Sequence, residues 1–310
     1  MRLLIAAFAC SLALSSGAEA AAGHVPGPVL LALNGSDLDR EIAKYTEQIR
    51  RDPEGTMAYN QRAYLYMNRG YLDRALADFT KLIELSPNYG QYYRMRAEAY
   101  GMAGDYDKAI ADYDSWLAFS PNDLTGHHNR GLTYRLKGDY RRAISDFTFN
   151  VQRYPDYVTE FRERGATRIM ADEFSSAIAD FGQVLHVKPQ DWEAILLSHL
   201  AAVRSGAGGA SLSPSIMSEY ERGKWPWPIL AFLTGGATAA DVRAAAAAGS
   251  ESDRRDQLCS TAFWLGENEI ATAKPDAAKP LLEEAVRKCP RLYFEYSLAK
   301  FELARLQSSH

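Results

Sequence analysis

One spacing of 34 residues runs through the middle of this sequence and constrains its fold more than any other feature. Four kinds of position recur at that step and keep a constant offset from one another. The prolines are Pro53, Pro87, Pro121, Pro155 and Pro189; the alanines Ala75, Ala109, Ala143 and Ala177; the small residues Ala63, Ala97, Gly131 and Gly165; the aromatic residues Phe79, Tyr113, Phe147 and Phe181. Several columns in register are typical of a repeat protein, whose short units stack to bury one continuous core.

Each unit reads as two helices. In the first unit, Tyr59, Ala63 and Tyr66 recur at steps of four and three, as on one face of a helix. A second apolar periodicity follows, and Pro87 ends it because proline cannot continue a helix. This 34-residue pattern resembles the tetratricopeptide repeat (TPR) family. The resemblance implies an all-α protein, a right-handed superhelical solenoid of stacked helix pairs with a C-terminal helical extension, that serves as an interaction scaffold.

The repeat grid divides the chain into five parts. The expected parts are a signal peptide (1–20), a linker with an N-terminal capping helix (21–55), four tandem TPR units (56–191), a degenerate repeat with a helical insert (192–258), and a C-terminal TPR-like unit with a capping helix (259–310). Outside the four units, helices are expected from Ser36 to about Arg51, over 192–204, around 216–221, from Thr238 to about Ala248, and over 292–306.

The N-terminus has the pattern of an export signal. Arg2 precedes an apolar run from Leu3 to Leu14, and a small-x-small pattern ends at Ala20. We expect cleavage near Ala20 and a periplasmic or secreted protein. Lipoprotein anchoring through Cys10 is disfavoured, because the apolar run continues past this cysteine. After the signal, no stretch is long and apolar enough to predict a transmembrane segment.

Two charged columns follow the same period. The first helices carry Arg62, Arg96, Arg130 and Arg164, and the second helices carry Asp78, Asp112, Asp146 and Asp180. Antiparallel helices of this length bring the two columns to about the same level. We therefore predict an Arg–Asp bridge within each repeat, in preference to a basic groove for an acidic ligand.

The first helices of stacked TPR units line a concave surface, which indicates where a partner binds. The candidate partner-binding residues are Asn60, Tyr64, Gln91, Arg94, Glu98, His128, Arg135 and Arg162. Such a mixture suits hydrogen bonding to a protein or an extended peptide. A net charge of −4 without a basic run argues against a nucleic-acid partner. A metal at His127-His128 is disfavoured because adjacent residues point to different helix faces, and no cofactor motif is present.

The C-terminal unit contains two cysteines. Cys259 is expected at the start of its first helix and Cys289 at the end of its second, so antiparallel packing would place them side by side. Once Cys10 is removed with the signal, these two are the remaining cysteines, and in an exported chain they predict a disulfide. A catalytic cysteine is disfavoured because no Cys–His arrangement is recognisable, and we expect no enzymatic activity.

Two segments resemble a narrower group, the bacterial NlpI-like envelope proteins. They are Trp225-Pro226-Trp227-Pro228-Ile229-Leu230-Ala231-Phe232, followed by Gly235-Gly236, and Phe263-Trp264-Leu265-Gly266-Glu267. This resemblance implies an adaptor that binds cell-wall hydrolases and a protease, often as a homodimer. Two alternatives stay open: a peptidoglycan or carbohydrate binder that uses Trp225 and Trp227 as an exposed pair, and an enzyme hidden in the C-terminal region.

Overall fold

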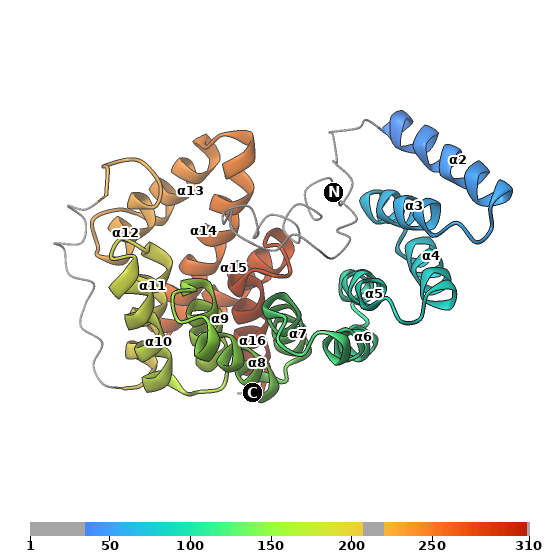
Figure 1. Ribbon diagram of the computed structural model, residues 1–310. Helices are drawn as coiled ribbons and strands as arrows, with labels where there is room; N and C mark the ends of the chain where they lie inside the picture. The colour runs from blue at the N-terminus through green and yellow to red at the C-terminus, as the bar shows by residue number, and fades with distance from the viewer. Residues whose placement is uncertain (1–34, 207–219, 309–310) are drawn as a thin grey trace. The chain divides into compact units, whose positions relative to one another are not determined.

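The computed structural model of the protein describes residues 35–206 and 220–308 (Figure 1). The expected signal peptide and most of the helix expected around 216–221 lie outside these ranges. The chain divides into two compact units, residues 1–133 and 134–310, and each is described by itself. Every regular element in the described ranges is a helix, and consecutive helices pack in pairs, which confirms the all-helical array of stacked pairs.

The four predicted repeats are four helix pairs. They follow α2 (Gly35–Arg51) and comprise α3 (Thr56–Arg69) with α4 (Leu72–Leu85), α5 (Gly90–Ala103) with α6 (Tyr106–Phe119), α7 (Leu124–Lys137) with α8 (Tyr140–Arg153), and α9 (Val158–Met170) with α10 (Phe174–Val187). The boundary between the two units falls within α7. Gly70 ends α3 in the left-handed region, with φ of 75°, where its N–H donates to the carbonyls of Tyr66 and Met67. Glycine is favoured there because it has no Cβ.

The repeated small and aromatic columns form the interior of the pairs that lie within one compact unit. Ala63, Phe79 and Phe181 are fully buried. At Gly165 a Cβ would lie 2.8 Å from ring atoms of Phe181, so the first helix of the fourth pair approaches its second helix more closely than a side chain permits. The period in the sequence is therefore the period of interhelical contacts.

The predicted Arg–Asp bridges form in three repeats. Arg62 Nε donates to Asp78 Oδ2 (2.9 Å) and its Nη2 to Oδ1 (2.7 Å), and the pairs Arg96–Asp112 and Arg164–Asp180 repeat this bidentate geometry. In the third repeat the two residues belong to different units, and Arg130 pairs with Asp114 (2.7 Å).

Each arginine also bonds backwards, to the second helix before it. The acceptors are Thr46 for Arg62 (3.1 Å), Thr80 for Arg96 (3.2 Å) and Thr148 for Arg164 (3.2 Å), each 16 residues earlier in the chain, and Asp114 stands at the same place for Arg130. One guanidinium thus joins the second helix of its own repeat to the second helix of the preceding repeat.

The bridge predicts a characteristic response to mutation. We expect Asp112→Ala to lower the free energy of unfolding by about 3 kcal/mol, because it leaves the largely buried Arg96 without its carboxylate. The double variant Arg96→Met, Asp112→Leu should recover most of that loss, since apolar residues of similar size fill the same space. Urea unfolding followed by circular dichroism measures both. Lys81→Ala, at an exposed pair with Glu84, is the control and should change stability by less than about 0.5 kcal/mol. Equal losses in the single and double variants would contradict the bridge.

The described residues of the C-terminal part add six helices. They are α11 (Trp192–Arg204), α12 (Trp227–Leu233), α13 (Ala239–Ala248), α14 (Glu251–Ala271), α15 (Pro275–Lys288) and α16 (Phe294–Ser308). The expected capping box of α13 is present, with Thr238 and Asp241 bonding each other's backbone N–H. Arg204 of α11 lies between Glu267 of α14 (2.6 Å) and Glu302 of α16, and this buried triad joins three helices.

The last helix does not simply cover the end of the stack. Figure 1 shows α16 alongside α8 and α9, and it packs on α9, α14 and α15. The ring of Tyr140 on α8 contacts Phe301 on α16 edge to face, with centroids 6.0 Å apart. The chain's own C-terminal helix therefore covers part of α9, the first helix of the fourth pair.

The predicted cysteine pair lies at disulfide distance. The Sγ atoms of Cys259 and Cys289 are 2.17 Å apart and the Cα atoms 4.8 Å apart. One detail of the prediction is wrong: α14 begins at Glu251, so Cys259 lies in its third turn rather than at its start. The helix begins earlier because Ser250 caps it, accepting a hydrogen bond from the N–H of Asp253.

Removal of the disulfide should destabilise the C-terminal helices. We expect Cys259→Ser together with Cys289→Ser to lower the free energy of unfolding by on the order of 3 kcal/mol, because the loop between the cysteines is no longer closed in the unfolded chain. Urea unfolding of both proteins without reductant measures the difference. Addition of reductant should lower the wild type to the level of the variant and leave the variant unchanged. A wild type insensitive to reductant, with both thiols free by mass spectrometry after alkylation, would contradict the bond.

Candidate functional site

Three of the predicted partner-binding residues form one cluster on α5. Gln91, Arg94 and Glu98 lie on the same face of this helix; Arg94 Nε donates to Gln91 Oε1 (2.8 Å), and its guanidinium pairs with Glu98. The guanidinium also lies over the ring of Trp116, 5.6 Å from the ring centroid. Arg94 is thus held by three partners within its own unit.

The electrostatics of this cluster follow from burial. Burial raises the pKa of Glu98, and burial together with the Glu98 carboxylate raises the pKa of Tyr64 to about 12. Burial also disfavours the charged form of Arg94, but the Glu98 carboxylate outweighs it and raises the pKa of Arg94. The cluster is internally paired, so a ligand would contact its polar edge and not a vacant charge.

The other predicted residues are dispersed. Asn60 is 4% exposed, and its Oδ1 has no hydrogen-bond partner among the described residues. His128 is half-buried in α7 and makes contacts of its own. Arg135 is only 2% exposed: it pairs with Glu163 and donates to the carbonyl of Leu292 (3.0 Å), just before α16. Arg135 therefore supports α16 in this structure and is not displayed to a partner.

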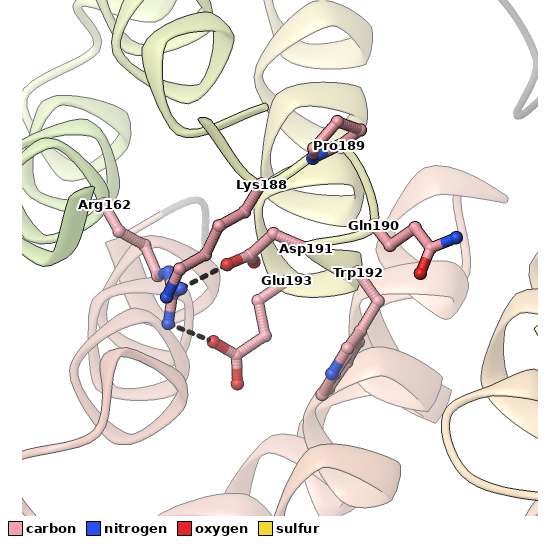
Figure 2. A pocket seen from close by; sticks show the side chains of 7 residues that line it. All are labelled: Arg162, Lys188, Pro189, Gln190, Asp191, Trp192 and Glu193. Atoms are coloured by element: carbon pink, nitrogen blue, oxygen red, sulfur yellow. Dashed lines mark hydrogen bonds and ion pairs between the residues drawn. The ribbon is translucent and has the colours of Figure 1, made fainter. Parts of the chain in front are cut away.

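Arg162 is the predicted residue that lines a large cavity. This Arg162 cavity has a volume of about 720 Å³ and lies between α9 and the start of α11. Its lining residues are Arg162, Lys188, Pro189, Gln190, Asp191, Trp192 and Glu193 (Figure 2). Arg162 Nη1 donates to Glu193 Oε2 (2.8 Å), and Nη2 pairs with Asp191.

Asp191 has two roles in this wall. Its Oδ1 accepts a hydrogen bond from the N–H of Ala194 (3.0 Å) and caps α11, while its Oδ2 faces Arg162. Asp191 and Glu193 are not among the site residues predicted from the sequence. The available signal was the position of Asp191 just after Pro189 and just before a predicted helix, which is typical of an N-cap. Nothing in the period indicated that the cap would also hold Arg162.

A second cavity adjoins the first and shares Trp192 and Glu193 with it. This Trp225 cavity has a volume of about 340 Å³. The rings of Trp192 and Trp225 meet edge to face, with centroids 6.3 Å apart. Trp225 and Trp227 are both half-buried, and Trp227 lies beneath the Arg222 guanidinium, 5.7 Å from its ring centroid. The two rings are thus engaged within the chain, which counts against a flat, exposed aromatic pair for a sugar.

Glu295, in the first turn of α16, lines the Trp225 cavity and is 2% exposed. Its Oε1 accepts a hydrogen bond from Ser260 Oγ (3.0 Å). Burial, and next the charge of Glu193, raise the pKa of Glu295 to about 8. The folded protein therefore holds a proton on this carboxyl through neutral pH.

The raised pKa predicts a pH-dependent stability. The folded state keeps the Glu295 proton up to pH about 8, whereas the unfolded chain loses it near the ordinary value of 4.5, so stability falls as pH rises between these values. Glu295→Gln should abolish this fall and, relative to wild type, gain a few kcal/mol between about pH 5 and about pH 8.5. Urea unfolding across that range measures it. Glu283→Gln, an exposed position on α15, is the matched control and should track the wild type. Parallel curves for Glu295→Gln and wild type would contradict a protonated Glu295.

No group of His, Cys, Asp and Glu side chains in residues 35–206 and 220–308 is arranged to hold a metal ion. In the same ranges, no helix combines the length and apolar character needed to cross a bilayer.

Comparison with known proteins supports the repeat. Residues 56–89 match the tetratricopeptide repeat family. No protein with a curated description matches the chain by sequence.

Solved structures support the fold. A tetratricopeptide repeat protein from Parabacteroides merdae is similar, with a TM-score of 0.58 and 16% identity over 88% of this chain and 93% of that one. The C-terminal part of a TPR repeat-containing protein from Cytophaga hutchinsonii has a TM-score of 0.51 and 14% identity over 82% of this chain and 91% of its own. At such identities the likeness extends to the fold alone.

Proposed function

We propose that this chain, whose residues 56–89 match the tetratricopeptide repeat family, is a non-enzymatic adaptor of the bacterial periplasm that binds an extended segment of a protein partner. The observation that carries the proposal is the Arg162 cavity, since it lies beside a first helix, where solenoids of this kind present their binding surface.

The walls of the Arg162 cavity suit a peptide. Lys188 and Gln190 are exposed, and Lys188 makes no ion pair with any described residue. Trp192 adds a half-buried ring, and Val187 next to the cavity is 53% exposed. A mostly open, mixed polar and apolar surface can bond the main chain of an extended segment and pack against its side chains. Arg162 itself is paired with two carboxylates, so it holds these wall residues in place and does not provide a free charge.

The place and class of the partner come from the sequence. The signal-peptide pattern that ends at Ala20 supports export to the periplasm, with the mature chain beginning near Ala21. The resemblance to the NlpI-like group supports cell-wall hydrolases or a protease as partners. An adaptor of this kind acts by co-localisation, because holding two proteins on one scaffold raises the effective concentration of one near the other.

The test uses Lys188→Glu, which reverses one exposed charge at the cavity and leaves the bonds of Arg162 in place. The mature protein is immobilised, envelope extract is passed over it, and captured proteins are quantified by mass spectrometry. We expect wild type to enrich a cell-wall hydrolase or a protease and Lys188→Glu to reduce that enrichment by about tenfold, since the change replaces attraction by repulsion for an acidic group of the segment that lies against Lys188. The intact mass of the envelope protein should correspond to cleavage near Ala20.

The matched control is Lys279→Glu, which makes the same charge change at an exposed position of α15. It should capture as wild type does. Equal capture by all three proteins would remove the Arg162 cavity from the site. Capture of no protein, with recovery of glycan instead, would overturn the adaptor and favour the carbohydrate hypothesis.

A further inference from the structure

The Trp225 cavity has an unusual lining. It is formed by Trp192, Glu193, Trp225, Asp253, Asp256, Gln257, Ser260, Tyr293 and Glu295, which come from the starts of α11, α14 and α16 and the segment before α12. Four of these side chains are carboxyl groups, three are aromatic rings, and none is basic. Two of the carboxylates form ion pairs with arginines of the chain: Glu193 with Arg162 (2.8 Å) and Asp256 with Arg255 (3.5 Å).

Glu295 differs from those two. It has no ion-pair partner among the described residues, and its one side-chain hydrogen bond comes from the neutral Ser260. The two charged groups that act on it most strongly, Glu193 and Glu163, have its own sign. A carboxyl group buried in this way carries an electrostatic penalty when it is ionised, and a cation in the adjoining cavity would remove that penalty.

The aromatic walls complement the carboxyl groups. A cationic ammonium or guanidinium group is attracted to the face of an indole or phenol ring, and the attraction grows when water is excluded. Trp192, Trp225 and Tyr293 each expose part of a ring to the cavity. With about 340 Å³, the space is at the small end of ligand pockets and fits one side chain better than a folded surface.

We propose that the Trp225 cavity binds the cationic side chain of a lysine or arginine in the partner segment. This inference rests on the proposed function and gives it a specificity. The two cavities share Trp192 and Glu193, so a peptide lying along the Arg162 cavity reaches the Trp225 cavity with one side chain. The cation would pair with Glu295, in its ionised form, and with Asp256 at the rim.

The test is a titration of the mature protein, followed through the indole N–H signals in two-dimensional NMR. The probes are pentapeptides blocked at both ends, four alanines around a central lysine, arginine or glutamine, and the free diamine cadaverine. We expect the lysine or arginine peptide to shift the signals of Trp192 and Trp225, assigned by Trp→Phe substitution, and to saturate. The glutamine peptide should leave them unchanged at the same concentration.

Variants identify the carboxyl groups. Glu295→Gln keeps an acceptor for Ser260 and should weaken binding of the cationic peptide at least about tenfold, since it removes the buried carboxyl group that would ionise to pair with the cation. Asp256→Asn, at the exposed rim, should weaken it less and provides a variant that does not depend on the interior. Glu283→Gln is the matched control and should bind as wild type.

Three results would overturn the assignment. They are no saturable shift with either cationic peptide, equal binding by Glu295→Gln and Glu283→Gln, or saturation by cadaverine without saturation by the blocked peptides, which would indicate a free amine as ligand. The capture experiment separates this inference from the proposed function. Loss of capture in Lys188→Glu with full capture in Glu295→Gln would leave the adaptor intact and remove the cation site.

Discussion

In three of the four helix pairs, the arginine in the middle of the first helix bonds in two directions along the chain, and the array of helix pairs depends on it. Sixteen residues ahead it meets an aspartate of its own second helix, and sixteen residues behind it meets a hydroxyl of the preceding one, as Arg96 does with Asp112 and Thr80. A single TPR unit buries too little surface to be stable alone, so contacts between neighbours set the stability of the whole. The planar guanidinium suits this place because its fork can bond two helices at once.

Arginines also join helices to one another in the C-terminal part, where the 34-residue period is absent. Arg204 joins Glu267 and Glu302 of two other helices, and Arg135 joins Glu163 to the chain just before α16. These arginines fix α16 beside α9, and its first turn then closes the Trp225 cavity. The binding walls of the C-terminal unit are thus a product of helix packing after the repeats, and the repeats alone would leave this surface open.

The features that follow the 34-residue period were predicted correctly from the sequence. Helix pairs, the small and aromatic columns and three Arg–Asp bridges follow from one 34-residue grid, and the cysteine pair follows from antiparallel order. The backward bonds to Thr46, Thr80 and Thr148 were missed because hydroxyl residues are common on helix surfaces, and only the structure shows them facing an arginine. Arg135 was assigned to a partner surface because α16 lies off the grid, so its position depends on packing that no periodicity encodes.

Charge pairing distinguishes the buried carboxyl groups of the C-terminal unit from one another. Glu267 and Glu302 both meet Arg204, so their burial is compensated inside the fold. Glu295 is buried to the same degree, has no ion-pair partner among the described residues and accepts a side-chain hydrogen bond from a hydroxyl, at a wall that three aromatic residues also line. A protonated acid there costs stability as pH rises, and a leucine would fill the space without that cost. A carboxyl at this position is therefore explained better by a charge that arrives from outside the chain than by the needs of the fold.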